Sequence, residues 1–236
     1  LLLFFMGVCI FSHAQISYEG VPRSSDYQLS ELVNQVVASA DLEMLKLEDE
    51  TNDLLGDRPR FAVLLPVDFD LENSGVWDDL PNNNRIWRLH IEVLEAKGIG
   101  LYFNDFYIPK GGDFYVYNET KTQVLGKFTE ENNHSSGAFV TSLIQSESVI
   151  LEYYEPAAVA GEGVIHVSSV AQAYRMVNSN NESNSSSSDP SDDCEVDVNC
   201  SEGNNWQDEK RGVVRMSMLI GNSLYWCSGS VVNDTA

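Results

Sequence analysis

The residues best suited to chemistry in this chain are its cysteines. Cys9 lies in an apolar N-terminal run, whereas Cys194, Cys200 and Cys227 lie in the last quarter of the sequence. Five residues separate Cys194 from Cys200, a spacing that fits neither a zinc knuckle nor a redox Cys-x-x-Cys pair. If CEVDVNC is extended, both sulfurs point to one face about 20 Å apart, so they cannot bridge unless the chain folds back.

The three C-terminal cysteines are disulfide candidates whose odd number leaves two arrangements open. One is a bridge between Cys194 and Cys200 with Cys227 unpaired; the other joins them to cysteines beyond Ala236. The extended pattern of CEVDVNC favours the second arrangement.

The four histidines do not form a recognisable site. His13, His90, His134 and His166 are scattered, and none shares a metal-ligand spacing with another histidine or with a cysteine. His90 and His166 lie in strand-like runs and are interpreted as surface residues or satisfied sheet residues. His134 precedes two serines, but a nucleophilic pair also needs a third, orienting group. No catalytic residue is assigned to any of them.

Two acidic clusters are the remaining candidates for ion binding. They are Glu48-Asp49-Glu50 and the segment from Asp189 to Asp193, and neither matches the twelve-residue calcium loop. Solvated surface charge is the better interpretation of both. We therefore predict no metal site and no cofactor.

The first 15 residues, LLLFFMGVCIFSHAQ, have the features of an incomplete export signal. The apolar run is shorter than the roughly 20 residues of a membrane span, and small residues precede the expected cleavage between Ala14 and Gln15. A lipid anchor at Cys9 is disfavoured because Val8 stands where a small residue is required. The mature protein is expected to be secreted, extracellular or periplasmic, and not attached to a membrane.

The charge of the chain excludes one large class of partners. Lys and Arg number 14 against 36 Asp and Glu, for a formal net charge of −22. A phosphate backbone would repel such a chain, so no nucleic-acid partner is expected.

The elements that must position these residues are mostly strands. Residues 27–37 have apolar residues at helical spacing and predict a short N-terminal amphipathic helix, whereas 42–50 fit either helix or strand. From residue 60 onward, short apolar runs alternate with turns and predict an antiparallel β-sandwich. The predicted strand-like runs are 61–69, 86–94, 98–108, 113–118, 122–128, 138–144, 148–156 and 163–175.

Residues 178–193 divide this sandwich from a different C-terminal segment. The stretch is rich in Ser, Asn and Asp with almost no apolar side chain, which predicts a flexible linker. Beyond it, 212–220 and 224–232 flank Gly221-Asn222-Ser223 and predict a hairpin. A hairpin alone is marginally stable, so this segment cannot be a complete domain.

The C-terminal segment resembles the start of the mature domain of bacterial lysyl endopeptidases, secreted serine proteases with the trypsin/chymotrypsin fold. The resemblance covers about 40 residues and depends on CEVDVNC, Glu202-Gly203, Trp206, Lys210-Arg211 and the CSGSVVN motif beginning at Cys227. A looser similarity to the propeptides of such proteases runs through the upstream region, for example at Gly75-Val76-Trp77 and Ile86-Trp87-Arg88-Leu89.

The resemblance implies a domain order and an activity. Residues 1–14 would be a partial signal peptide, 15–177 a propeptide that assists folding or inhibits, 178–193 the linker, and 194–236 the first strands of a double β-barrel protease. Protein or peptide substrates are implied, and the Ser, His and Asp triad is expected beyond Ala236, so this fragment would be inactive alone. Cys227 would pair with a cysteine after the catalytic histidine.

Two alternatives remain open. Residues 176–193 contain neither Lys nor Arg, so lysine specificity and self-processing at the linker are not implied by the sequence itself. The competing function is a secreted β-sandwich that binds carbohydrate or cell surfaces through exposed aromatic residues, with Trp77, Tyr102, Tyr107 and Tyr115 as candidates.

Overall fold

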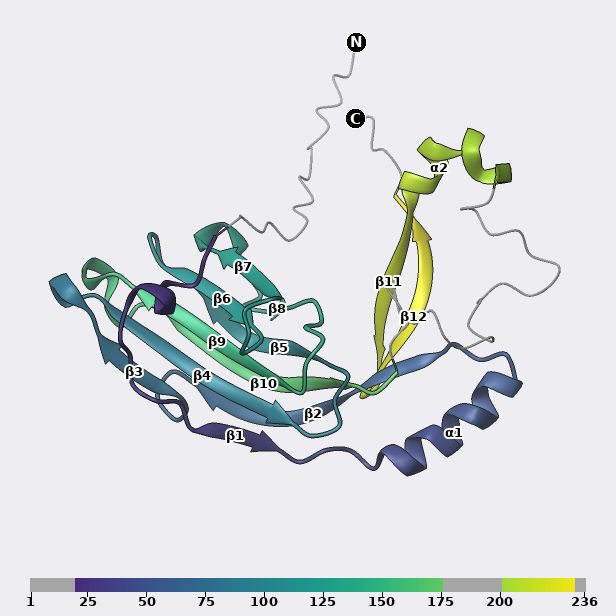
Figure 1. The fold of residues 1–236 in the computed structure, drawn as a ribbon, viewed down its shortest axis with the longest axis horizontal. Coiled ribbons are helices and arrows are strands. Elements are labelled where there is room, and N and C mark those ends of the chain that lie inside the picture. Colours follow the sequence, from purple (N-terminus) through teal and green to yellow (C-terminus); the bar gives the residue numbers. More distant parts are fainter. Residues whose placement is uncertain (1–19, 176–200, 232–236) are drawn as a thin grey trace, which may run out of the picture.

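The structure, a computed structural model, describes residues 20–175 and 201–231 (Figure 1). Twelve strands of the described chain form two six-stranded sheets, so the predicted mostly-β fold is confirmed. The described helices are α1 (Leu42–Leu54) and α2 (Gln207–Gly212), besides short 3-10 turns. Neither is long and apolar enough to cross a membrane.

The first sheet, sheet A, is built around strand β4. Its order is β1-β4-β9-β6-β7, and β3 pairs with the same edge of β4 as β1 but nearer its start. The β1–β4 pair is parallel, and the other pairs in this sheet are antiparallel. The strands are β1 (Asn34–Val37), β3 (Val76–Asp79), β4 (Arg85–Val93), β6 (Asp113–Tyr117), β7 (Val124–Phe128) and β9 (Ser148–Glu155).

The second sheet, sheet B, combines upstream strands with the C-terminal segment. Its order is β11-β12-β2-β10-β5-β8, and all pairs are antiparallel. The strands are β2 (Arg60–Asp70), β5 (Gly98–Tyr107), β8 (Phe139–Val140), β10 (Val164–Ala173), β11 (Val213–Ile220) and β12 (Ser223–Ser230).

The core lies between the inner faces of the two sheets. The predicted alternation in β4 is confirmed, because Trp87, Leu89, Ile91 and Val93 are fully buried in it. Next to them, five phenylalanines stack edge-to-face or in parallel across both sheets, which makes the core strongly aromatic. They are Phe103, Phe106, Phe114, Phe128 and Phe139.

The strand prediction is correct for most runs and incomplete for others. The run 138–144 forms strand only at Phe139–Val140, after which Thr141 and Ile144 bond individually to Leu101 and Ile99. Strands β1 and β3 lie outside the predicted runs.

The predicted N-terminal helix is wrong in position. Val33 and Val36, expected on its apolar face, are 73% and 63% exposed, and Asn34–Val37 forms β1 along the edge of β4. The helix instead occupies Leu42–Leu54, where the Asp41 side chain accepts a hydrogen bond from the Met44 N–H at 3.0 Å. Pairing with β4, a contact distant in sequence, overrides the local helical spacing of 27–37.

The segment 20–32, here called the strap, covers the outer face of sheet A. Arg23 donates to buried Asp113 at 2.8 Å, and the Ser24 N–H donates to Glu152, which is fully buried. Tyr117 donates to the other oxygen of Glu152 at 2.7 Å. The polar outward residues of these strands are therefore enclosed and hydrogen-bonded.

Candidate functional site

The hairpin β11–β12 is joined to the edge of sheet B through β2, and this junction is the candidate site. Leu224 lies opposite Ala62 and Ser223 opposite Val63 in an antiparallel ladder. The Leu64 N–H donates to the Asn222 carbonyl at 2.8 Å, and the Trp226 N–H donates to the Pro59 carbonyl at 3.1 Å. The predicted hairpin therefore exists, but it continues the upstream sheet rather than standing alone (Figure 1).

Side chains strengthen the junction on one face of the hairpin. Leu224 is 2% exposed and packs in a cluster with Phe61 and the small residues Ala62, Ala171 and Ala173. The rings of Phe61 and Trp226 stack with centroids 3.7 Å apart and an interplanar angle of 11°. Because small residues form this part of the sheet surface, the hairpin can approach it closely.

The pairing of the hairpin with β2 ends at Val63, because Ser223 opposite it is the first residue of β12 and the hairpin turns at Gly221 and Asn222. Successive residues of a strand alternate the side to which their N–H points, so residue 66 points to the same edge as Leu64. Pro66 has no N–H to donate at that edge. The free edge of β2 beyond this point is protected against further strand addition.

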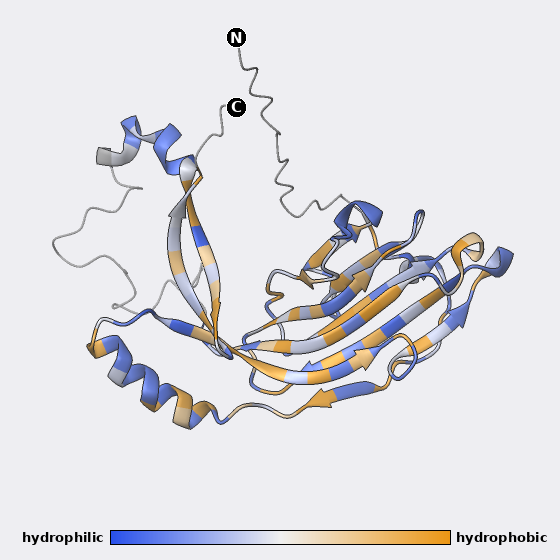
Figure 2. Ribbon diagram, turned by 180° about the vertical axis from the view of Figure 1, so that it is seen from behind, coloured by the Kyte–Doolittle hydropathy of each residue, from blue (hydrophilic) through white to orange (hydrophobic). Residues whose placement is uncertain are grey.

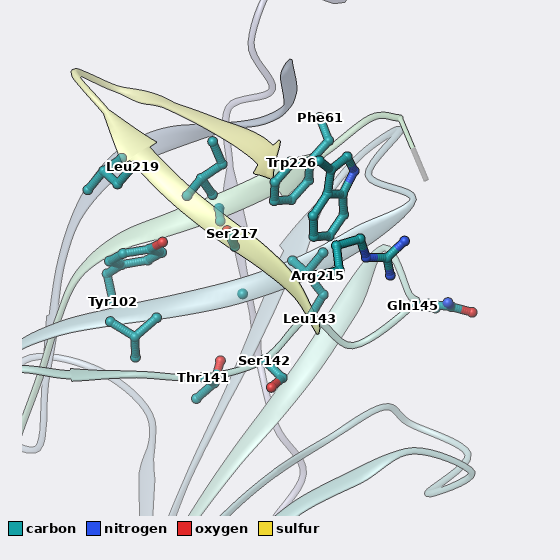
Figure 3. Close-up of a pocket in the computed structure, with 14 residues that line it drawn as sticks. Phe61, Tyr102, Thr141, Ser142, Leu143, Gln145, Arg215, Ser217, Leu219 and Trp226 are labelled. Carbon is teal, nitrogen blue, oxygen red and sulfur yellow. The ribbon is translucent and has the colours of Figure 1, made fainter. Parts of the chain in front are cut away.

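A cavity of about 650 Å³ lies between the hairpin and the outer face of sheet B (Figure 3). Gly100 and Ala171 contribute the sheet surface, and Tyr102, Thr141 and Leu143 line the cavity from β5 and the segment after β8. From the hairpin, the lining residues Arg215, Ser217, Leu219, Leu224 and Trp226 share one face by strand alternation.

Of the described residues that line this cavity, Arg215 is the single charged one. Its guanidinium lies 4.2 Å from the centroid of the Trp226 ring, a cation–π arrangement. Within residues 20–175 and 201–231, no carboxylate forms an ion pair with Arg215, whereas Arg23, Arg60 and Arg88 each have one.

A buried ion pair holds α1 against the start of β2, directly beside the junction. Arg60 donates to Asp49 at 2.9 Å, and the Tyr174 hydroxyl donates to the other Asp49 oxygen at 2.8 Å. Burial alone lowers the pKa of Arg60, but its hydrogen bond to Glu48, together with nearby Tyr174 and Asp49, raises it above the usual arginine range. Burial, helped by the bond to Asp49, also raises the pKa of Tyr174.

The interpretation of Glu48-Asp49-Glu50 as solvated charge is therefore wrong for Asp49. This side chain is 4% exposed and neutralised by Arg60, because helix α1 turns it inward while Glu48 and Glu50 stay exposed. No calcium site results from the cluster in the part of the chain that the structure describes, where no group of three metal-ligating side chains occurs.

The other residues singled out from the sequence are only partly placed. Cys194, Cys200, Ala14, Gln15 and the linker 178–193 lie outside the described residues. Cys227 lies in β12 with a free thiol, on the hairpin face opposite Trp226. Its predicted partner therefore stays a prediction.

His90, His134 and His166 occupy ordinary structural positions, and His13 lies outside the described residues. His90 is 7% exposed, with Nε2 3.0 Å from Glu119, and His166 lies 2.6 Å from Asp68. His134 accepts a hydrogen bond from the Ser136 N–H, a local turn contact. Around these three histidines, the part of the chain that the structure describes offers neither a nucleophile with an orienting third group nor a proton relay to the cavity.

The predicted exposed aromatic surface is wrong. Tyr115 is 3% exposed beneath the strap, and Trp77 packs against the core under the guanidinium of Arg85. Tyr102 lines the cavity. Of the four candidate aromatic residues, Tyr107 is the one with a largely exposed side chain, at 45%. Strand alternation places these rings on different faces, and the strap covers the face that carries Tyr115.

The candidate site was not predicted from the sequence. The small residues Ala62, Gly100, Ala171 and Ala173 form its surface, and they come from three separate strands. A sequence signal was present in Pro66, whose position in a central-looking strand marks β2 as having a partly free edge.

The comparisons with known proteins bear on the C-terminal segment. The family described as "Lysyl endopeptidase, C-terminal domain" matches residues 188–236, less than half of the chain. This match supports a protein related to lysyl endopeptidases.

Among solved structures, the chain is similar to PliG of Aeromonas hydrophila, a periplasmic inhibitor of g-type lysozyme, at 12% identity. The match covers 59% of this chain and 98% of that chain, with a TM-score of 0.22. A score this low carries no argument about fold or function.

Proposed function

We propose that this chain is part of the precursor of an exported serine endopeptidase, in which the sandwich (residues 20–175) is a prodomain that holds the first hairpin of the protease. One observation carries the proposal. Strand β12, within the segment that matches the lysyl endopeptidase family, pairs with β2 of the sandwich.

The physical benefit of this pairing is stability for a hairpin that has little of its own. A two-stranded hairpin is marginally stable in water, and long-range β pairing is slow to form. The edge of β2 supplies a third strand, and Phe61 supplies a stacking surface for Trp226. A hairpin held in this way keeps its register while the rest of a protease domain is made.

The docking has features of a temporary contact. The hairpin leaves large hydrophobic residues exposed, including Val213, Met216 and Ile220 at 62%, 40% and 47%, and Figure 2 shows apolar residues along both of its strands. The Trp226 indole N–H is buried without a hydrogen-bond partner among the described residues. Such an unpaired donor costs about 1 to 3 kcal/mol, which favours later release.

The remaining details of the proposal follow from the resemblance. The mature enzyme would hydrolyse peptide bonds, after lysine if it shares the specificity of the family that it resembles, with a Ser nucleophile, a His base and an Asp that orients the His. It would act outside the cytoplasm, on protein or peptide substrates, after separation from its own prodomain.

The test is co-expression of residues 15–175 with a protease domain that begins with residues 194–236 and continues through its catalytic residues. We expect a higher yield of soluble, active protease with the prodomain than without it. Leu64→Pro in the prodomain removes the N–H that donates to Asn222 and should abolish most of this gain.

Leu64→Ala is the matched control, because it shortens the side chain but keeps the N–H. It should retain most of the gain in yield. An equal yield of active protease with and without the prodomain would remove the proposed folding role.

A further inference from the structure

We infer that the cavity between the hairpin and sheet B is a binding site for a small amphipathic carboxylate, an alkyl or aryl body with one anionic head. This inference goes beyond the proposed function, but both depend on the hairpin being docked on sheet B. The ligand would touch both parts of the precursor and stabilise their pairing.

The volume and lining of the cavity fit such a ligand. Small-molecule sites have volumes of about 300 to 1,000 Å³ and are mostly apolar with a few polar groups. This cavity has about 650 Å³, with apolar surface from Tyr102 and Leu143 and hydroxyl groups from Thr141 and Ser217. It is open on the hairpin side, where Leu219 is 47% exposed. Above Gly100 the Leu143 side chain already covers the sheet, since its Cδ2 would lie 3.2 Å from a Cβ added at Gly100, so an apolar body would lie beside Leu143.

The charge of the lining selects an anion. Among residues 20–175 and 201–231, Arg215 is the single charged residue that lines the cavity, and none of the lining residues is Asp or Glu. The described part of this chain shows no ion pair for Arg215, although the protein carries a net charge of −22 and most of its described arginines have carboxylate partners. The acidic surface would repel anions elsewhere, so recognition depends on this one side chain.

The side chain of Arg215 suits a carboxylate better than a diffuse charge. Its guanidinium carbon lies 4.2 Å from the centroid of the Trp226 ring, and Arg215 is exposed to solvent. A planar guanidinium can make a two-point contact with a carboxylate. Figure 3 shows Arg215 beside Trp226, with Leu143 next to it. An anionic head at Arg215 would place the apolar body toward Leu219 and Tyr102.

The experiment titrates the full chain with decanoate below its micelle concentration, by calorimetry and by amide chemical shifts. We expect binding with shifts at Gly100, Ala171 and Ser217. Decanol, with the same body and no charge, should bind about tenfold more weakly, and acetate, with the charge and no body, should not bind measurably.

Two variants locate the site. Arg215→Gln should weaken decanoate about tenfold and make decanoate and decanol equal, while Ser217→Phe should fill the cavity and abolish binding. Arg58→Gln is the matched control: Arg58 also has no ion pair in the described part of the chain, but it does not line the cavity, so affinity should be unchanged.

Amide exchange at Leu64 and Trp226, measured without ligand, separates this inference from the proposed function. If these amides are unprotected, the hairpin is not docked and both proposals fail. If they are protected but decanoate does not bind, or binds Arg215→Gln as tightly as the unchanged chain, the carboxylate site alone is overturned.

Discussion

Strands β4 and β11 are both rich in apolar residues but have different surroundings. In β4, Trp87, Leu89, Ile91 and Val93 are all completely buried between the sheets. In β11, Val213, Leu219 and Ile220 are 62%, 47% and 47% exposed. An apolar strand pattern thus predicts the strand, whereas its burial depends on whether the fold supplies a second layer. The sandwich supplies this second layer for β4. The hairpin contacts only the edge of β2 and part of the outer face of sheet B.

The largest expected effect is in the sandwich core. Leu151→Ala removes a fully buried side chain of β9 and should lower the free energy of unfolding by about 2 to 5 kcal/mol, because a cavity remains. Urea denaturation followed by circular dichroism measures this. Leu54→Ala, at a leucine that is 90% exposed, is the control and should change it by less than about 0.5 kcal/mol. Equal effects of the two substitutions would contradict the assigned core.

A smaller and local effect is expected in the hairpin. Trp226→Ala removes the stacking on Phe61 and should lower the opening free energy of β12 by about 1 to 2 kcal/mol. Amide hydrogen exchange at Leu64 and Leu224 reports the opening, while exchange in β4 should not change. A global loss of stability would mean that the hairpin belongs to the same cooperative unit as the sandwich.

The strands of the sandwich could be predicted because their information is local. Alternation in 86–94 and turn residues around it were sufficient to place β4 and the face that Trp87 and Leu89 share. The helix was misplaced because Val33, Val36 and Val37 also fit a helical spacing, and only the edge of β4 decides between the two structures. Asp49 was misjudged for a similar reason, since its partner Arg60 becomes visible only when α1 packs beside β2.

The candidate site could not be predicted from local pattern. Its lining comes from β5, β10, the segment after β8 and the hairpin, and residues such as Gly100 and Arg215 are far apart in the chain. The resemblance pointed to the correct C-terminal segment, but it gave no reason to expect that β12 pairs with β2. That pairing depends on an edge left free by the upstream fold.

The covered face of sheet A, unlike the open hairpin, should make the unfolding free energy depend on alkaline pH. Burial, and next to it the charge of Asp113, raise the pKa of Tyr115 to about 12 beneath the strap. Because an unfolded tyrosine ionises near pH 10, this contribution is complete below pH 10 and is lost as pH rises toward 12. Tyr115→Phe should therefore show a shallower loss of unfolding free energy over this window, by up to about 2 kcal/mol. Parallel curves for the two proteins would contradict burial of this hydroxyl.

The smallest effect tests whether α1 supports the junction. Asp41→Ala removes the side chain that caps the helix at the Met44 N–H and should destabilise α1 by about 1 kcal/mol. Helix α1 carries Asp49, which fixes Arg60, and Arg60 lies opposite Tyr225 of β12 in the ladder. Faster amide exchange is therefore expected in α1 and β12, with β4 and β9 unchanged. Asp41→Asn keeps a capping oxygen and should restore most of the protection. If exchange increases in α1 but not in β12, the hairpin is held by β2 and Phe61 without help from the helix, and the stability of the junction is independent of the buried ion pair beside it.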